Sequence, residues 1–384
     1  MCFNCFFFWL WRIKAAPDSN SSASVESDEP VTISGDADVT KESAPKKPSK
    51  YGQIKKQKIP NRPSSTPISN KALADNLMAA RQKEAERFLK QGADANTVTA
   101  NGEPVLYTAL RFGFEKIAED LILYGADVNA RTRTGHTPLH MAVSKQNKKI
   151  VQLLLQNEAD ANIASSSNET PLVMAIQRGD TAIVNLLLRF RADPNQAGSA
   201  GNPLHLAISK AQVETVENLL KFGADPNTPS KLGTPLQVVL RNGNVKIAEL
   251  LASNKADVNI TDSIGESLLH KAAAKGQAGF AGVIIANGAN VNAQDKYDET
   301  PLHEAAAKGR LAVVKLLLKN NANLYAKTKK SWTALHESAR FGHAETSAYL
   351  ISRGLSRHAY NSDGNTPGGL ASHLKHGEVM QILK

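Results

Sequence analysis

The chain has 384 residues, of which 41% are hydrophobic, and its 46 Lys and Arg outnumber its 36 Asp and Glu. The resulting net charge of +10 is spread along the sequence, which favours acidic partners but excludes the clustered charge of a nucleic-acid-binding module. The two cysteines are Cys2 and Cys5, so a disulfide framework or a cysteine-based zinc site is excluded for the rest of the chain, and a reducing, intracellular compartment is indicated.

Residues 1–16 are an apolar segment rich in Phe and Trp, with Arg12 and Lys14 near its end. The ten apolar residues among its first eleven are too few to cross a bilayer, and no bases precede them as in a signal peptide. The pattern is typical of a membrane-surface anchor in which Cys2 and Cys5 carry acyl chains and the bases contact anionic lipid. A disordered apolar tail or an incorrectly assigned start codon would also explain it.

Residues 17–68 are predicted to be a disordered linker, because Ser, Pro and charged residues dominate and large apolar residues are few. The linker divides by charge. Residues 18–42 carry seven acids and one lysine, whereas residues 46–62 carry only bases. The basic half is a candidate nuclear import signal or a second contact with anionic lipid, and a solvated linker is the alternative.

The rest of the chain repeats one unit, which is clearest at residues 298–323. Thr300 and Pro301 predict a helix start, since a threonine hydroxyl caps a helix and proline is tolerated at its first position. A short alanine-rich helix follows, then a more apolar helix over residues 313–318, which Asn321 is expected to close in the left-handed conformation. Two such helices bury too little surface to offset their ordering entropy, so the unit requires similar neighbours.

Copies of this helix start recur every 32 or 33 residues. They begin at Thr137, Thr170, Asn202, Thr234, Ser267, Thr333 and Thr366. The period and the Thr-Pro-Leu-His motif resemble the ankyrin-repeat family. The resemblance implies an all-α, ankyrin-repeat solenoid of about ten helix-turn-helix units with β-hairpin finger loops over residues 69–384. We expect this solenoid to be a monomer.

Two irregularities are expected to destabilise the stack. The left-handed position is occupied by Glu158, Arg191 and Lys255 in three units, where a side chain costs about 1–2 kcal/mol relative to glycine. Gly279 and Gly282 lie inside a predicted helix, where each glycine costs roughly 1 kcal/mol.

Five histidines share one place in the motif. They are His140, His205, His270, His303 and His336. Stacked helices lie about 8–10 Å apart, so equivalent histidines of neighbouring units cannot share a metal ion. The resemblance implies instead that they form hydrogen bonds within the turn region. The sequence contains no catalytic motif, so we expect no catalytic residue, no metal and no cofactor.

The surface is the remaining candidate for function. In the ankyrin fold the end of the inner helix lines a concave groove, and eight units of this chain each place one base there. These bases are Arg111, Lys145, Arg178, Lys210, Arg241, Lys275, Lys308 and Arg340, with Phe112 and Phe341 at the two ends. The stacked bases predict a positive stripe that binds an acidic protein segment. The alternative is that they only stabilise helix ends through the helix dipole.

Two aromatic residues at predicted finger tips are further candidates. Tyr297 follows Lys296, and Trp332 follows three nearby lysines. Trp332 is predicted either to anchor an interface or to pack against the adjacent finger. Together these features predict a cytoplasmic protein-binding adaptor or scaffold that an acylated N-terminus tethers to a membrane. A nuclear regulator that binds a transcription factor through its repeats is the alternative.

Overall fold

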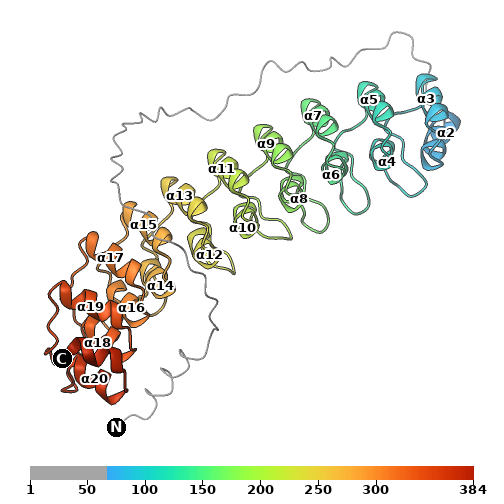
Figure 1. The fold of residues 1–384 in the computed structure, drawn as a ribbon. Helices are drawn as coiled ribbons and strands as arrows, with labels where there is room; N and C mark the ends of the chain where they lie inside the picture. The colour runs from blue at the N-terminus through green and yellow to red at the C-terminus, as the bar shows by residue number, and fades with distance from the viewer. Residues whose placement is uncertain (1–66) are drawn as a thin grey trace, which may run out of the picture. The chain divides into compact units, whose positions relative to one another are not determined.

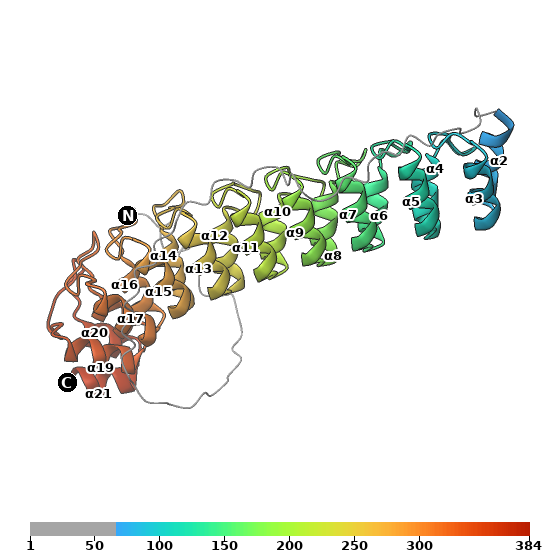
Figure 2. The same ribbon diagram turned by 90° about the horizontal axis from the view of Figure 1, so that it is seen from above.

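The computed structural model describes residues 67–384, which contain twenty helices and no strand. Cys2, Cys5 and the predicted linker up to residue 66 lie outside the described residues. Consecutive helices pack together as ten pairs, and the pairs stack side by side (Figures 1 and 2). We refer to each pair as a unit, to its even-numbered helix as the first helix and to its odd-numbered helix as the second helix.

The first helices form one row of the stack and the second helices form the other (Figure 1). The first helices are α2 (Pro67–Met78), α4 (Val105–Phe112), α6 (Pro138–Ser144), α8 (Pro171–Arg178), α10 (Pro203–Ser209), α12 (Pro235–Asn242), α14 (Leu268–Lys275), α16 (Pro301–Ala307), α18 (Ala334–Arg340) and α20 (Pro367–His373). The second helices are α3 (Gln82–Lys90), α5 (Glu115–Leu123), α7 (Lys148–Gln156), α9 (Thr181–Arg189), α11 (Val213–Lys221), α13 (Val245–Ser253), α15 (Ala278–Ala286), α17 (Leu311–Lys319), α19 (Ala344–Ser352) and α21 (Gly377–Leu383).

The predicted helix starts and stops are observed. Thr170 precedes α8, its hydroxyl accepts a hydrogen bond from the backbone N–H of Val173, and Pro171 occupies the first helical position. Asn321 closes the unit of α16 and α17 in the left-handed conformation, with φ of 64°. Glu158, Arg191 and Lys255 also adopt positive φ, at 69°, 68° and 67°.

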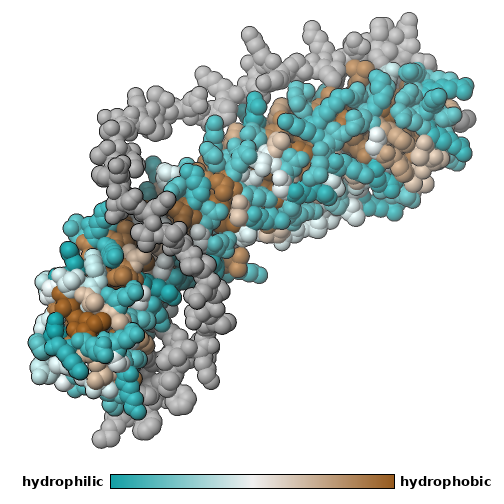
Figure 3. Space-filling view, viewed as in Figure 1, coloured by the Kyte–Doolittle hydropathy of each residue, from teal (hydrophilic) through white to brown (hydrophobic). Residues whose placement is uncertain are grey.

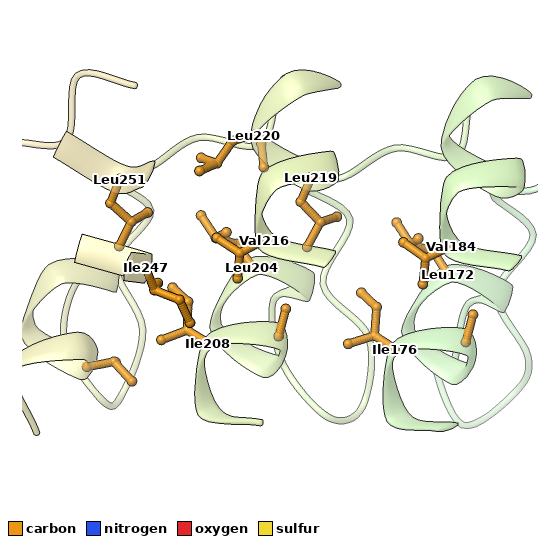
Figure 4. Close-up of a cluster of buried hydrophobic side chains, with 14 of the residues drawn as sticks. Leu172, Ile176, Val184, Leu204, Ile208, Val216, Leu219, Leu220, Ile247 and Leu251 are labelled. Carbon is orange, nitrogen blue, oxygen red and sulfur yellow. The ribbon is translucent and has the colours of Figure 1, made fainter. Parts of the chain in front are cut away.

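The core lies between the helix pairs and is continuous along the stack. Figure 4 shows Leu172 and Ile176 of α8 and Leu204 and Ile208 of α10, whose side chains point into the space between adjacent units. All four are buried. Because each buried Leu or Ile contributes about 1.5–3 kcal/mol, most of the stability of a unit comes from its neighbours.

Gly279 has a packing role that the sequence does not reveal. A Cβ atom on Gly279 would lie 2.9 Å from Cγ2 of Val245, so the glycine allows α15 to approach α13 closely. A Cβ atom on Gly282 would meet no neighbour within 4 Å. Close packing against α13 therefore explains why a glycine stands at position 279. No contact explains the glycine at position 282.

The finger loops are compact turns with isolated β-bridges and contain no extended strand within residues 67–384. Backbone hydrogen bonds join several neighbouring finger tips. They run from Ser166 N to Thr134 O, Lys296 N to Ile264 O, Lys329 N to Tyr297 O and Ser362 N to Lys330 O. The tips of adjacent units are thus held in fixed positions relative to one another.

The face of the stack in Figure 3 is mainly hydrophilic, and hydrophobic residues show between the helix pairs. None of the helices in residues 67–384 combines the length and the apolar character needed to cross a membrane.

Candidate functional site

The structure places the predicted bases at corresponding ends of the first helices. Arg111, Arg178, Arg241, Lys275 and Arg340 lie in the last turn of their helices. Lys145, Lys210 and Lys308 are the residues that directly follow their helices. The repeat therefore brings all eight bases to one edge of the row of first helices.

Three of these bases are free to meet a partner. Lys145, Lys210 and Arg241 are exposed, and they follow or end α6, α10 and α12. Their side chains form no hydrogen bond or ion pair with any other residue in the part of the chain that the structure describes. An exposed charged group loses little hydration free energy when an opposite charge binds it at the surface.

Other bases of the series bind within the stack. Nη2 of Arg111 lies 3.0 Å from a carboxylate oxygen of Glu103, and Nη2 of Arg178 donates to Oγ of Ser144 at 3.0 Å. Nζ of Lys275 donates to the carbonyl of Leu240 at 3.2 Å. These contacts join Arg111 to the loop before its own helix and join Arg178 and Lys275 to the preceding unit.

Phenylalanines with stacked neighbours mark both ends of the series. The ring of Phe112 is 38% exposed, its centroid lies 5.8 Å from that of Phe114, and Cζ of Arg111 lies 4.8 Å from it. Phe341 is partly buried, and Cζ of Arg340 lies 5.5 Å from its centroid. Both rings thus combine apolar surface with an adjacent guanidinium group.

The motif histidines join each helix start to the next finger. Nδ1 of His140 accepts a hydrogen bond from the backbone N–H of Thr137 at 3.1 Å, and its Nε2 lies 3.0 Å from the carbonyl of Glu169. The neutral imidazole with its proton on Nε2 satisfies both contacts. Burial lowers the pKa of His140 and that of His303 to about 4. Both side chains are therefore neutral at pH 7, as a structural hydrogen-bonding role requires.

His205 differs from the other motif histidines. Its Nε2 lies 2.9 Å from the carbonyl of Gly233, but its buried Nδ1 has no hydrogen-bond partner among the described residues. The cause is Asn202, which caps α10 by accepting from Leu204 N and replaces the usual threonine. Among residues 67–384, no three His, Cys, Asp or Glu side chains gather into a group that could hold a metal ion.

An asparagine ladder links the units through the turns that follow the second helices. Nδ2 of Asn129 donates to the carbonyl of Glu158 at 3.1 Å, and its Oδ1 accepts from the backbone N–H of Asp160 at 2.8 Å. The same pair of bonds is made by Asn96, Asn162, Asn195, Asn227, Asn259 and Asn292. Sequence reasoning missed the ladder, although in seven successive closing turns an asparagine lies two residues after an Asp or Asn.

The comparison with protein families agrees with this architecture. A family model described as "Ankyrin repeats (3 copies)" matches residues 77–165, 160–230, 236–328 and 302–384. The chain belongs to the ankyrin-repeat family. None of the curated proteins gives a significant match to it. The ankyrin-repeat stack is a protein-interaction domain, and the exposed side chains described above are its candidate contacts.

The two finger-tip candidates of this ankyrin-repeat protein have different environments. Tyr297 is 52% exposed, and Nζ of Lys296 lies 4.9 Å from its ring centroid. Trp332 is only 9% exposed, its ring lies 5.9 Å from that of His336, and Cζ of Arg340 lies 5.1 Å from it. Of the two roles predicted for Trp332, its low exposure favours packing over anchoring an interface, whereas Tyr297 is accessible.

A buried carboxyl group lies beside the last of the ankyrin-repeat bases. Burial raises the pKa of Glu337 to about 8, and the charges of Glu299 and Glu304 add to this rise while Arg340 and Lys308 oppose it. The folded protein therefore favours the protonated carboxyl. Because the folded-state pKa exceeds the unfolded value of 4.5, stability from this group is present below pH 4.5 and is lost as the pH rises toward 8.

We expect Glu337→Gln to stabilise the protein at neutral pH, because an amide mimics the protonated carboxyl. The gain should be about 3 kcal/mol at pH 7 and close to zero at pH 4.5, since a tenfold change in a protonation equilibrium corresponds to about 1.4 kcal/mol. Urea denaturation at both pH values measures it. Glu345→Gln is the control, since Glu345 is exposed in the first turn of α19. An equal effect of both variants at pH 7 would contradict the assignment.

Proposed function

We propose that this ankyrin-repeat protein is an adaptor or scaffold that binds an acidic protein segment along the ends of its first helices. Ankyrin-repeat proteins are typically non-enzymatic binding modules, and we propose the same for this chain. The supporting observation is the set of exposed bases at Lys145, Lys210 and Arg241, which lie at the corresponding ends of the first helices α6, α10 and α12. A series of like charges raises the association rate of an oppositely charged segment and sets its position.

We expect the triple variant Lys145→Glu, Lys210→Glu, Arg241→Glu to bind an acidic peptide at least tenfold more weakly, a loss of about 1.4 kcal/mol. The probe is a fluorescent 24-residue peptide of alternating Glu and Ser, and fluorescence anisotropy in 0.1 M salt gives its Kd. Each substitution removes an attraction and adds a repulsion, while all three side chains are exposed, so the fold should persist.

The control triple variant carries Lys148→Glu, Arg189→Glu and Lys221→Glu on the second helices α7, α9 and α11. These bases are also exposed, and the change in net charge is the same. The control should weaken binding less than threefold. Equal losses for both triple variants would show a general charge effect and would reject the first helices as the binding site.

We also propose that acylation of Cys2 and Cys5 tethers the protein to a membrane, as the apolar N-terminal sequence suggests. A fluorescent protein fused to residues 1–20 should then decorate membranes and become diffuse after Cys2→Ser with Cys5→Ser. Diffuse fluorescence of the unmutated fusion would reject the tether.

The second candidate, a nuclear regulator, is favoured by the bases in residues 46–62. It predicts nuclear full-length protein that leaves the nucleus when Lys55, Lys56 and Lys58 are replaced.

A further inference from the structure

Two units far apart in the stack carry the same Arg-Phe-Gly sequence. It occurs at residues 111–113, where α4 ends, and at residues 340–342, where α18 ends. In the six units between them, the place of the phenylalanine is occupied by Lys145, Arg178, Lys210, Asn242, Lys275 and Lys308. The edge of the first helices therefore has an aromatic residue at each end and polar, mostly basic residues between.

The two ends share one local geometry. Phe112 stacks on Phe114 with 25° between the ring planes, and Phe341 stacks on His343 with 28° between the planes. In each case the preceding arginine places its guanidinium carbon 4.8 or 5.5 Å from the phenylalanine centroid. Each ring thus lies beside a second flat ring and a cation, and these contacts restrict its orientation before a partner arrives.

This geometry indicates what each end would bind. The accessible part of each aromatic ring gains most by covering an apolar side chain, and the bases along the same edge attract carboxylates close to that side chain. A rigid aromatic ring also loses little conformational entropy on binding, which is why aromatic residues and arginine dominate binding hot spots. Each end therefore suits an apolar residue that is flanked by acids.

The distance between the ends sets the length of the partner. The two phenylalanines lie seven units apart, in the units of α4 and α18 (Figures 1 and 2). With about 10 Å between neighbouring helices, they are separated by roughly 70 Å. An extended chain covers about 3.3–3.6 Å per residue, so about 20 residues are needed to reach from one end to the other.

We propose that the partner of this surface is an extended acidic segment of about 20 residues that carries an apolar residue at each end. The acids face the bases of the intervening units, and the apolar residues cover Phe112 and Phe341. This inference rests on the proposed binding of an acidic segment, and it adds the length of that segment and the positions of its two anchors.

Four fluorescent probes test the inference on the full chain by anisotropy. The first is a 24-residue peptide of alternating Glu and Ser with leucine at both ends, and the second is the same peptide without leucines. The third is a 12-residue version with leucine at both ends, and the fourth is a 24-nucleotide oligothymidine. We expect the first peptide to bind at least tenfold more tightly than each of the others, because linking two anchors raises their effective concentration.

Variants of the protein then locate the anchors. Phe112→Ser and Phe341→Ser should each reduce the affinity for the two-leucine peptide of 24 residues to within threefold of the value for the peptide without leucines. Neither should change the affinity for the peptide without leucines more than twofold. Circular dichroism checks the fold of each variant. The comparison of peptides on the unmodified protein does not depend on whether the variants fold.

The outcomes separate this inference from the proposed function. Equal binding of the two 24-residue peptides would overturn the anchors, while loss of that binding in the triple variant of the bases would still support an acidic partner. Equal binding of the long and short peptides would overturn the length. Tightest binding of oligothymidine would show a general polyanion surface and overturn the inference. Absence of binding by every peptide would overturn both.

Discussion

Lowering the pH from 7 to 4 should reduce the free energy of unfolding by about 6 kcal/mol through His140 and His303 alone. Both histidines are buried, and the pKa of each is lowered to about 4 from its ordinary value of 6.5. The folded state therefore favours the neutral ring. Its contribution to stability is fully present above pH 6.5 and is lost as the pH falls toward 4, at about 3 kcal/mol for each histidine.

The chain itself supplies the control for this prediction. In the unit of α12 the motif histidine is replaced by Gln237, whose Oε1 accepts from the backbone N–H of Thr234 at 3.0 Å. The double variant His140→Gln, His303→Gln should reproduce this cap without a titratable group. It should be less stable than the unmodified chain at pH 7, because the bonds from Nε2 to Glu169 and Trp332 are lost.

Urea denaturation at pH 7, 5.5 and 4 measures the pH effect. The difference in unfolding free energy between the unmodified chain and the double variant should shrink or reverse at pH 4, because only the unmodified chain must protonate these rings on unfolding. Other groups titrate in both proteins and cancel. Parallel pH profiles would contradict the prediction. Burial also lowers the pKa values of His205, His336 and His343, so acid sensitivity should extend beyond the two positions.

Phe280→Ala should destabilise the protein by about 3–5 kcal/mol, the usual cost of truncating a fully buried aromatic residue. Phe280 is 1% exposed and is the largest of the fully buried side chains in residues 67–384. It lies in α15, where the close contact between Gly279 and Val245 leaves the backbone little freedom to collapse into the cavity. The change should lower the urea midpoint of the full chain.

Phe112→Ala is the matched control for this prediction. The substitution is chemically the same, but Phe112 is 38% exposed at the end of α4, so its loss should cost less than about 1.5 kcal/mol. In a linear stack each unit contacts only its neighbours, so amide exchange after Phe280→Ala should increase mainly in α15 and in the helices packed against it, α13, α14 and α17. A uniform increase in amide exchange throughout residues 67–384 would contradict this local effect.

The repeat pattern predicted the helices because their signals are local. The cap at Thr170, the proline after it and the left-handed Asn321 act within a few residues of their own positions, so they can be recognised without neighbours. The placement of the eight bases at equivalent helix ends followed from the same period. Family membership also followed from the period, since the Thr-Pro-Leu-His motif recurs in register.

Tertiary contacts, both within a unit and between units, could not be predicted from the sequence. Whether Trp332 is exposed depends on Arg340 and His336 beside it, and whether Gly279 is a defect depends on Val245 in another unit. The partners of the asparagine ladder likewise lie about thirty residues away in the chain, as for Asn129 and Asp160.

The amino-acid order by itself thus determined where each unit begins and ends and which residue types share a position. The tertiary structure alone decided which bases are free and which are bound, and which carboxyl is protonated. The physical reason is that the environment of a side chain in a stack is set by the unit next to it. Lys145 and Lys275 hold similar places in the repeat, yet Lys145 is exposed without a partner in the described residues, whereas Lys275 donates to Leu240.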